Sequence, residues 1–111
     1  MKVGDYIYTS WGYDQTNIDF AVITEISKTG KTIKARRTKA KVVDDAKYSD
    51  GLAPTEPVGD WFRLYVRYHD DNRVYFVGQY PYCLGFSDRR MGYFWLWDGN
   101  PKYETKSQYG H

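Results

Sequence analysis

The stretch IDFAVITEISKTGKTIKARRTKAKVV, residues 18–43, predicts a long β-hairpin on which the rest of the chain is built. Apolar and polar residues alternate along its first arm, a period of two that is typical of a half-buried strand. The apolar face of this arm carries Ile18, Phe20, Val22 and Ile26. The opposite face carries Asp19 and Glu25. The turn at Ser27–Gly30 ends in a glycine, which accepts the positive φ that hairpin turns commonly need.

The second arm of the hairpin concentrates positive charge. It alternates until the doublet Arg36–Arg37, where a β-bulge would restore the phase. With that bulge, the inward residues are Ile33, Ala35, Thr38, Ala40 and Val42. The outward residues are Lys34, Arg36, Arg37, Lys39 and Lys41. Residues 28–41 carry seven basic residues and no acid, so this arm predicts a surface that attracts phosphate groups.

The rest of the chain leaves an alternative to that interpretation. Residues 44–60 hold five acids, one lysine and four Gly or Pro, which predicts a long acidic loop with a short helical turn near Asp44–Tyr48. This loop could fold back over the basic arm and neutralise it. In that case the basic residues are a solvated face and not a binding site.

The remaining patterns predict one all-β domain over residues 1–111. Further strands are expected at Val3–Trp11, Trp61–Tyr68, Arg73–Tyr80 and Tyr93–Trp97, with a loop at Gly85–Gly92 and a flexible tail at residues 102–111. Aromatic residues make up 19% of the chain, 12 of them tyrosine, which favours pleated strands over a helical core. We therefore expect about six strands in a small SH3-like barrel or a strongly bent antiparallel sheet, with an OB-like barrel as the alternative.

The strand WFRLYVRY, residues 61–68, is the second candidate for binding. Its strict alternation puts two rings and two guanidinium groups on one face: Trp61, Arg63, Tyr65 and Arg67. Such a face can stack on bases while it pairs with phosphates. The alternative is that both faces of the strand are covered and the rings belong to a second small core. If this face and the basic arm share a surface, the case for nucleic acid is stronger.

The segment from Trp11 to Asn17 has two interpretations. It is either a structural loop that satisfies its own backbone or a recognition loop, whose contact residues would be Trp11, Tyr13, Asp14, Gln15 and Asn17.

No constellation for catalysis or for metal or cofactor binding stands out. The chain has one cysteine, Cys83, and no paired carboxylates, Gly-rich phosphate loop or catalytic triad. We expect no enzyme activity, no metal and no cofactor. No apolar run is long enough to span a membrane, and a cytoplasmic location in the host cell follows as the expectation.

Two motifs carry a resemblance to a known family. Ser10–Phe20 (SWGYDQTNIDF) and Leu96–Pro101 (LWDGNP) resemble a family of short uncharacterised proteins encoded by phages and other mobile elements. No biochemical role comes with the family. The resemblance implies a phage or mobile-element context, which adds inhibitors of host defence systems, of the anti-CRISPR or anti-restriction type, to the classes considered.

These patterns lead to one leading function and one alternative. The leading prediction is a small non-enzymatic protein that contacts nucleic acid or a nucleoprotein through the basic hairpin, with the Trp61–Arg67 face as stacking groups. The alternative is a protein-binding inhibitor of a host defence system that blocks an interface. Neither prediction fixes the oligomeric state.

Overall fold

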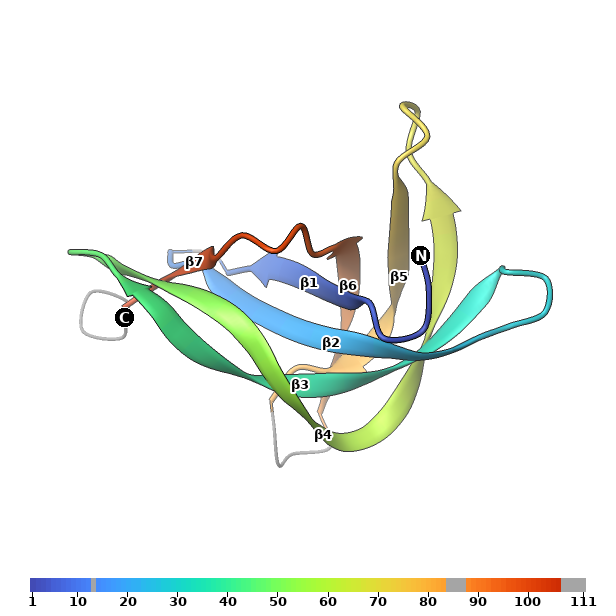
Figure 1. Cartoon of the computed structure of the whole chain (residues 1–111), viewed down its shortest axis with the longest axis horizontal. Helices are drawn as coiled ribbons and strands as arrows, with labels where there is room; N and C mark the ends of the chain where they lie inside the picture. The colour runs from blue at the N-terminus through green and yellow to red at the C-terminus, as the bar shows by residue number, and fades with distance from the viewer. Residues whose placement is uncertain (13, 84–87, 107–111) are drawn as a thin grey trace.

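The protein is described here from a computed structural model, which covers residues 1–12, 14–83 and 88–106. Over these ranges the chain forms seven strands: β1 (Tyr6–Trp11), β2 (Asn17–Ile26), β3 (Thr32–Asp45), β4 (Ser49–Tyr68), β5 (Val74–Pro81), β6 (Arg89–Leu96) and β7 (Lys102–Thr105). They make one antiparallel sheet in the order β3-β2-β1-β6-β5-β4-β7, and β3 also pairs with β4, so that the sheet closes in a ring (Figure 1). The expected all-β class and strongly bent antiparallel sheet are confirmed, with seven strands in place of six.

The predicted hairpin is β2 and β3. Gly30 has a φ of 72°, and its N–H donates to the carbonyl of Ser27 at 2.9 Å. The Ser27 side chain accepts a hydrogen bond from the N–H of Thr32 at 3.2 Å, which closes the turn. The turn chemistry is thus the one that the sequence predicted.

The prediction of an acidic loop over residues 44–60 was wrong. β3 continues to Asp45, β4 begins at Ser49, and the two strands pair from Asp45↔Asp50 to Thr32↔Tyr65. The prolines that suggested a loop lie at irregular positions of this pairing, since the register shifts between the pairs Thr38↔Pro57 and Ala40↔Pro54. Proline is tolerated in a strand at such bulges, where its missing N–H breaks no ladder bond. β4 is therefore a long, bent strand.

The core lies inside the ring. Its buried residues are Ile7, Ala21, Ile23, Ile33, Ala35, Phe62, Leu64, Val66, Phe76, Tyr80 and Phe94. A second, smaller cluster of Ile18, Phe20 and Leu52 packs with Tyr8 and Trp97. Both faces of β2 are therefore covered over Ile18–Ile23, where Ile18 and Phe20 belong to one cluster and Ala21 and Ile23 to the other.

The expected single apolar face of β2 was consequently wrong. The register with β3 shifts between Ile23 and Glu25, and this bulge returns Ile26 to the side of the main core. In β3, Ala40 and Val42 are exposed and not inward, because they lie beyond the ring on the arm formed with β4.

Two boundaries near the C-terminus also differ from expectation. The expected loop at Gly85–Gly92 is in part strand, because β6 begins at Arg89 and pairs with β5 from Pro81↔Arg89 onward. Lys102–Thr105, expected in the flexible tail, is β7 and pairs with the start of β4. Residues 107–111 of that tail and the loop residues 84–87 lie outside the described residues. None of the described residues belongs to a helix that could cross a membrane.

Candidate functional site

The basic arm and the aromatic strand meet on the outside of the ring. β3 and β4 pair with Lys34 directly opposite Arg63, and both side chains point outward because their neighbours Ala35 and Phe62 are buried in the core. The ammonium of Lys34 lies 4.4 Å from the ring centroid of Trp61. Cations of one strand therefore lie among the aromatic rings of the next.

The exposed side chains of β4 continue this surface. Trp61 and Tyr65 are 48% and 46% exposed, and the Arg67 guanidinium lies 5.6 Å from the ring centroid of Tyr65. Arg36, on the same face of β3 as Lys34, donates from Nε to the carbonyl of Gly59 at 2.8 Å. Arg89 of β6 lies beside Trp61, Arg63 and Tyr65. We call the following residues the cationic–aromatic face: Lys34, Arg36, Trp61, Arg63, Tyr65, Arg67 and Arg89.

A shallow hollow of about 720 Å³, bordered by Trp61, Arg63, Tyr65 and Arg89, lies open to solvent within the cationic–aromatic face. Within the described part of the chain, Arg63 and Arg89 form no ion pair and no side-chain hydrogen bond. Their guanidinium groups are therefore available to an anion. Sequence reasoning missed Arg89 because it placed this residue in a loop, and only the pairing of β6 with β5 brings it to the hollow.

An aromatic surface adjoins this face on β5 and β6. Tyr65 aligns with Val77 and Tyr93 across the sheet, and Arg67 aligns with Tyr75 and Trp95. The rings of Tyr75 and Trp95 are 5.3 Å apart and those of Tyr75 and Tyr93 are 6.5 Å apart, measured between centroids. We call Tyr75, Met91, Tyr93 and Trp95 the β5–β6 aromatic surface.

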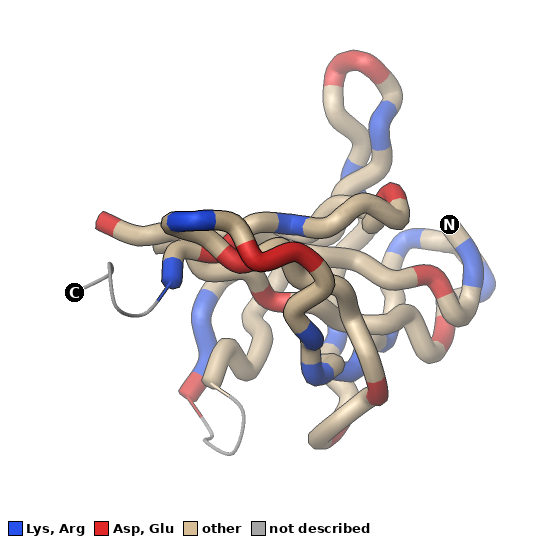
Figure 2. The backbone as a smooth tube through the Cα atoms, turned by 60° about the vertical axis from the view of Figure 1, so that its left-hand side comes forward, with Lys and Arg blue, Asp and Glu red and all other residues tan. Residues whose placement is uncertain are grey.

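Two of the predicted basic residues lie elsewhere. Lys39 and Lys41 are on the part of β3 that extends past the ring with β4, and Lys39 pairs there with Glu56 at 3.5 Å. Figure 2 shows that basic residues are spread over several segments, with acidic segments between them. The predicted outward row of basic residues on β3 is therefore divided. Of these residues, only Lys34 and Arg36 lie beside residues 61–68 of β4.

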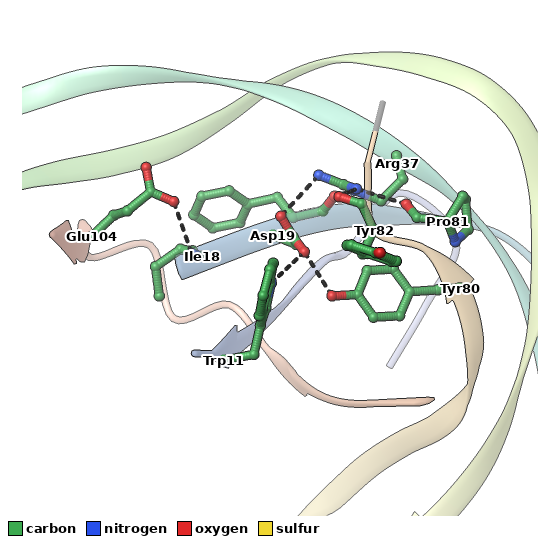
Figure 3. Close-up of polar contacts among 9 residues, drawn as sticks. Trp11, Ile18, Asp19, Arg37, Tyr80, Pro81, Tyr82 and Glu104 are labelled. Atoms are coloured by element: carbon green, nitrogen blue, oxygen red, sulfur yellow. Dashed lines mark hydrogen bonds and ion pairs between the residues drawn. The ribbon is translucent and has the colours of Figure 1, made fainter. Parts of the chain in front are cut away.

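The assignment of Arg37 to the outer face was wrong. Arg37 is only 5% exposed, and its guanidinium forms an ion pair with the carboxylate of Asp19, itself 8% exposed, at 3.1 Å. Arg37 also donates to the carbonyls of Phe20 at 3.2 Å, Pro81 at 2.7 Å and Tyr82 at 3.0 Å (Figure 3). The alternation of Ile33 and Ala35 continues to Arg37. The register with β4 does shift between Ala35 and Arg37, but the extra residues lie in β4, so the shift does not turn Arg37 outward.

Asp19 is the acceptor at the centre of this buried network, and its predicted outward position was wrong too. Its Oδ2 accepts hydrogen bonds from the Trp11 indole at 2.7 Å and from the Tyr80 hydroxyl at 2.6 Å (Figure 3). Burial, together with the nearby Asp19 carboxylate, raises the pKa of Tyr80 above its ordinary value. The network connects β1, β2, β3 and the end of β5. Its additional hydrogen bonds offset the desolvation cost of burying the Arg37–Asp19 ion pair. Its role is structural.

The Trp11–Asn17 loop is held by the fold. Trp11 uses its indole N–H on Asp19, and the amide of Gln15 donates to the side chain of Asn17 at 3.4 Å. The backbone of Thr16 exchanges hydrogen bonds with Thr105 of β7. A Cβ on Gly12 would lie 1.9 Å from the Gln15 carbonyl, so the loop is tight. These contacts favour the structural interpretation for the described residues, while Tyr13 lies outside them.

No metal site is found in the described ranges, where no three His, Cys, Asp or Glu residues gather closely enough to hold an ion. Comparison of the chain with protein-family models, with curated proteins and with solved structures gives no match. The resemblance to phage and mobile-element proteins accordingly stays a prediction. Only the geometry of the surface therefore bears on function.

Proposed function

We propose that this protein binds single-stranded nucleic acid, without catalysis, through the cationic–aromatic face. The observation that carries the proposal is the position of Lys34, opposite Arg63 and with its ammonium over the Trp61 ring. Two residues of the basic arm, Lys34 and Arg36, thus share a surface with the outward side chains of residues 61–67.

The chemistry of this face suits exposed bases. Stacking of a base on an aromatic side chain contributes about 1–3 kcal/mol. It requires that the face of the base is accessible, which is the case in a single strand but not in a duplex. Trp61 and Tyr65 are exposed rings on one strand face. Arg63 and Arg89, which border the same hollow, supply cations for the phosphates between the bases.

The experiment is a titration of fluorescent single-stranded DNA and RNA oligonucleotides with the purified protein, followed by anisotropy at several salt concentrations. We expect affinity to fall steeply with salt, and we expect Arg63→Glu and Trp61→Ala each to weaken binding at least about tenfold. Lys28→Glu, in the β2–β3 turn, is the matched control for charge and should change affinity little. Equal effects of Arg63→Glu and Lys28→Glu, or binding that does not depend on salt, would contradict the proposal.

The β5–β6 aromatic surface supports a second candidate function, a protein-binding inhibitor of a host defence system in a phage or mobile element. Tyr93 is 58% exposed and Met91 46%, and aromatic residues and methionine are enriched in protein interfaces. This candidate predicts that a host protein stays bound to the tagged chain after nuclease treatment. It also predicts that Tyr93→Ala releases that protein while Arg63→Glu does not.

A further inference from the structure

Among the described strands, none pairs with one edge of β3 beyond Arg37. β2 pairs with β3 only as far as Ala21↔Arg37, whereas β4 pairs with β3 on its other edge as far as Asp45. Within the described residues, no strand pairs with the β2-side edge of residues 38–45, which form an arm with β4 that reaches away from the ring (Figure 1). The backbone N–H and C=O groups of an open edge are a template for another strand.

The side chains along this edge combine two exposed valines with lysines and aspartates. Val42 and Val43, in the middle of the segment, are 53% and 46% exposed. Two lysines precede the valines and two aspartates follow them, in the order TKAKVVDD over residues 38–45. When residues 40–45 of two copies are laid antiparallel, Lys41 of one lies opposite Asp44 of the other and Ala40 lies opposite Asp45.

We propose that the free β3 edge is a homodimer interface, in which residues 40–45 of two copies pair antiparallel about a two-fold axis at Val42–Val43. In this register Lys41 of each copy lies opposite Asp44 of the other. The two side chains are on the same face of β3, because their partners on β4, Ala53 and Gly51, are two residues apart. The contact between Lys41 and Asp44 therefore occurs twice in the dimer, once in each direction, as in any two-fold interface.

Both residues are able to make this contact. Lys41 is exposed and, in the described part of the chain, forms no ion pair or side-chain hydrogen bond. Asp44 is exposed and accepts a hydrogen bond from the Tyr103 hydroxyl on one oxygen, which leaves its other oxygen for a cation. A second copy of the chain fits the edge better than an unrelated strand, because its own Lys41 and Asp44 come to lie opposite Asp44 and Lys41 of the first copy. The inference does not depend on the proposed function.

The test is sedimentation velocity over the micromolar to millimolar range. Because one pair of short strands makes a small interface, we expect a weak, concentration-dependent dimer of twice the 13.1 kDa chain. Lys41→Glu alone and Asp44→Lys alone place like charges opposite each other twice, and each variant should stay monomeric. An equimolar mixture of the two variants should form a heterodimer, because both cross-strand pairs are then of opposite charge.

Controls separate this effect from a change of fold or of overall charge. Lys28→Glu makes the same charge change away from the edge and should dimerise like the wild type. Tyr103→Phe removes the hydrogen bond to Asp44 but keeps its charge, and should also dimerise. A wild-type chain that is monomeric throughout would overturn the proposal, and so would a dimer that persists in both single variants. A mixture of the folded variants that stays monomeric would overturn the register.

Discussion

Substitution of Arg37 by methionine tests whether the buried network stabilises the ring. Methionine keeps the length of the side chain but removes the charge and four hydrogen bonds, to the Asp19 carboxylate and to three backbone carbonyls. It leaves Asp19, whose side chain is only 11% exposed, as a buried carboxylate without its cation. Removal of one partner of a buried pair costs about 3–5 kcal/mol. We expect a loss of that size in the free energy of unfolding, a large part of the roughly 5–15 kcal/mol typical of a domain.

Urea unfolding followed by tryptophan fluorescence and circular dichroism measures this loss. Arg36→Met is the matched control: Arg36 is the adjacent residue and donates one hydrogen bond, to the Gly59 carbonyl, so its loss should cost about 0.5–1.5 kcal/mol. Asp19→Asn introduced into Arg37→Met should recover stability, because asparagine removes the uncompensated charge and keeps an acceptor for Trp11 and Tyr80. A loss below about 1 kcal/mol for Arg37→Met, or a double variant less stable than the single one, would refute this account of the network.

Three further predictions concern the core. Gly92→Ala should lower the free energy of unfolding by about 1–3 kcal/mol in the same urea experiment, because a Cβ there would lie 2.5 Å from the Tyr80 ring; a neutral result would contradict this packing. Thr38→Val should keep or raise the unfolding free energy, since the Thr38 hydroxyl is buried without a hydrogen-bond partner among the described protein atoms, and a marked loss would reveal a partner. Above pH 10 the wild type should lose stability by up to about 1.4 kcal/mol per pH unit more than Tyr80→Phe does, because the raised pKa keeps the folded phenol protonated while the unfolded one ionises; parallel pH profiles would exclude this coupling.

The position of Arg37 shows where sequence reasoning stopped. Strict alternation from Ile33 through Ala35 already pointed Arg37 inward, but an isolated charge inside a core is so unfavourable that a bulge was the better expectation. The partner that makes burial acceptable, Asp19, is 18 residues away on β2, and its own inward position depends on the same network. Neither residue could be placed without the other.

Only part of the cationic–aromatic face could be predicted from the sequence, because its residues come from strands that are distant in the chain. Lys34, Trp61, Arg63, Tyr65 and Arg67 face outward as their local alternation indicates. That they lie together follows from the pairing of β3 with β4, which the sequence left open.

The sequence by itself determined the all-β class, the β2–β3 hairpin with its Gly30 turn, and the outward face of residues 61–67. These depend on periodicity and turn chemistry within a few residues, which the chain carries locally. Tertiary structure alone decided that β3 and β4 close the ring, that Asp19 and Arg37 are buried as a pair, and that no described strand covers the β3 edge past Arg37. Each of these depends on which distant strand lies alongside, and a single-residue bulge changes the answer by turning the following side chains to the other face.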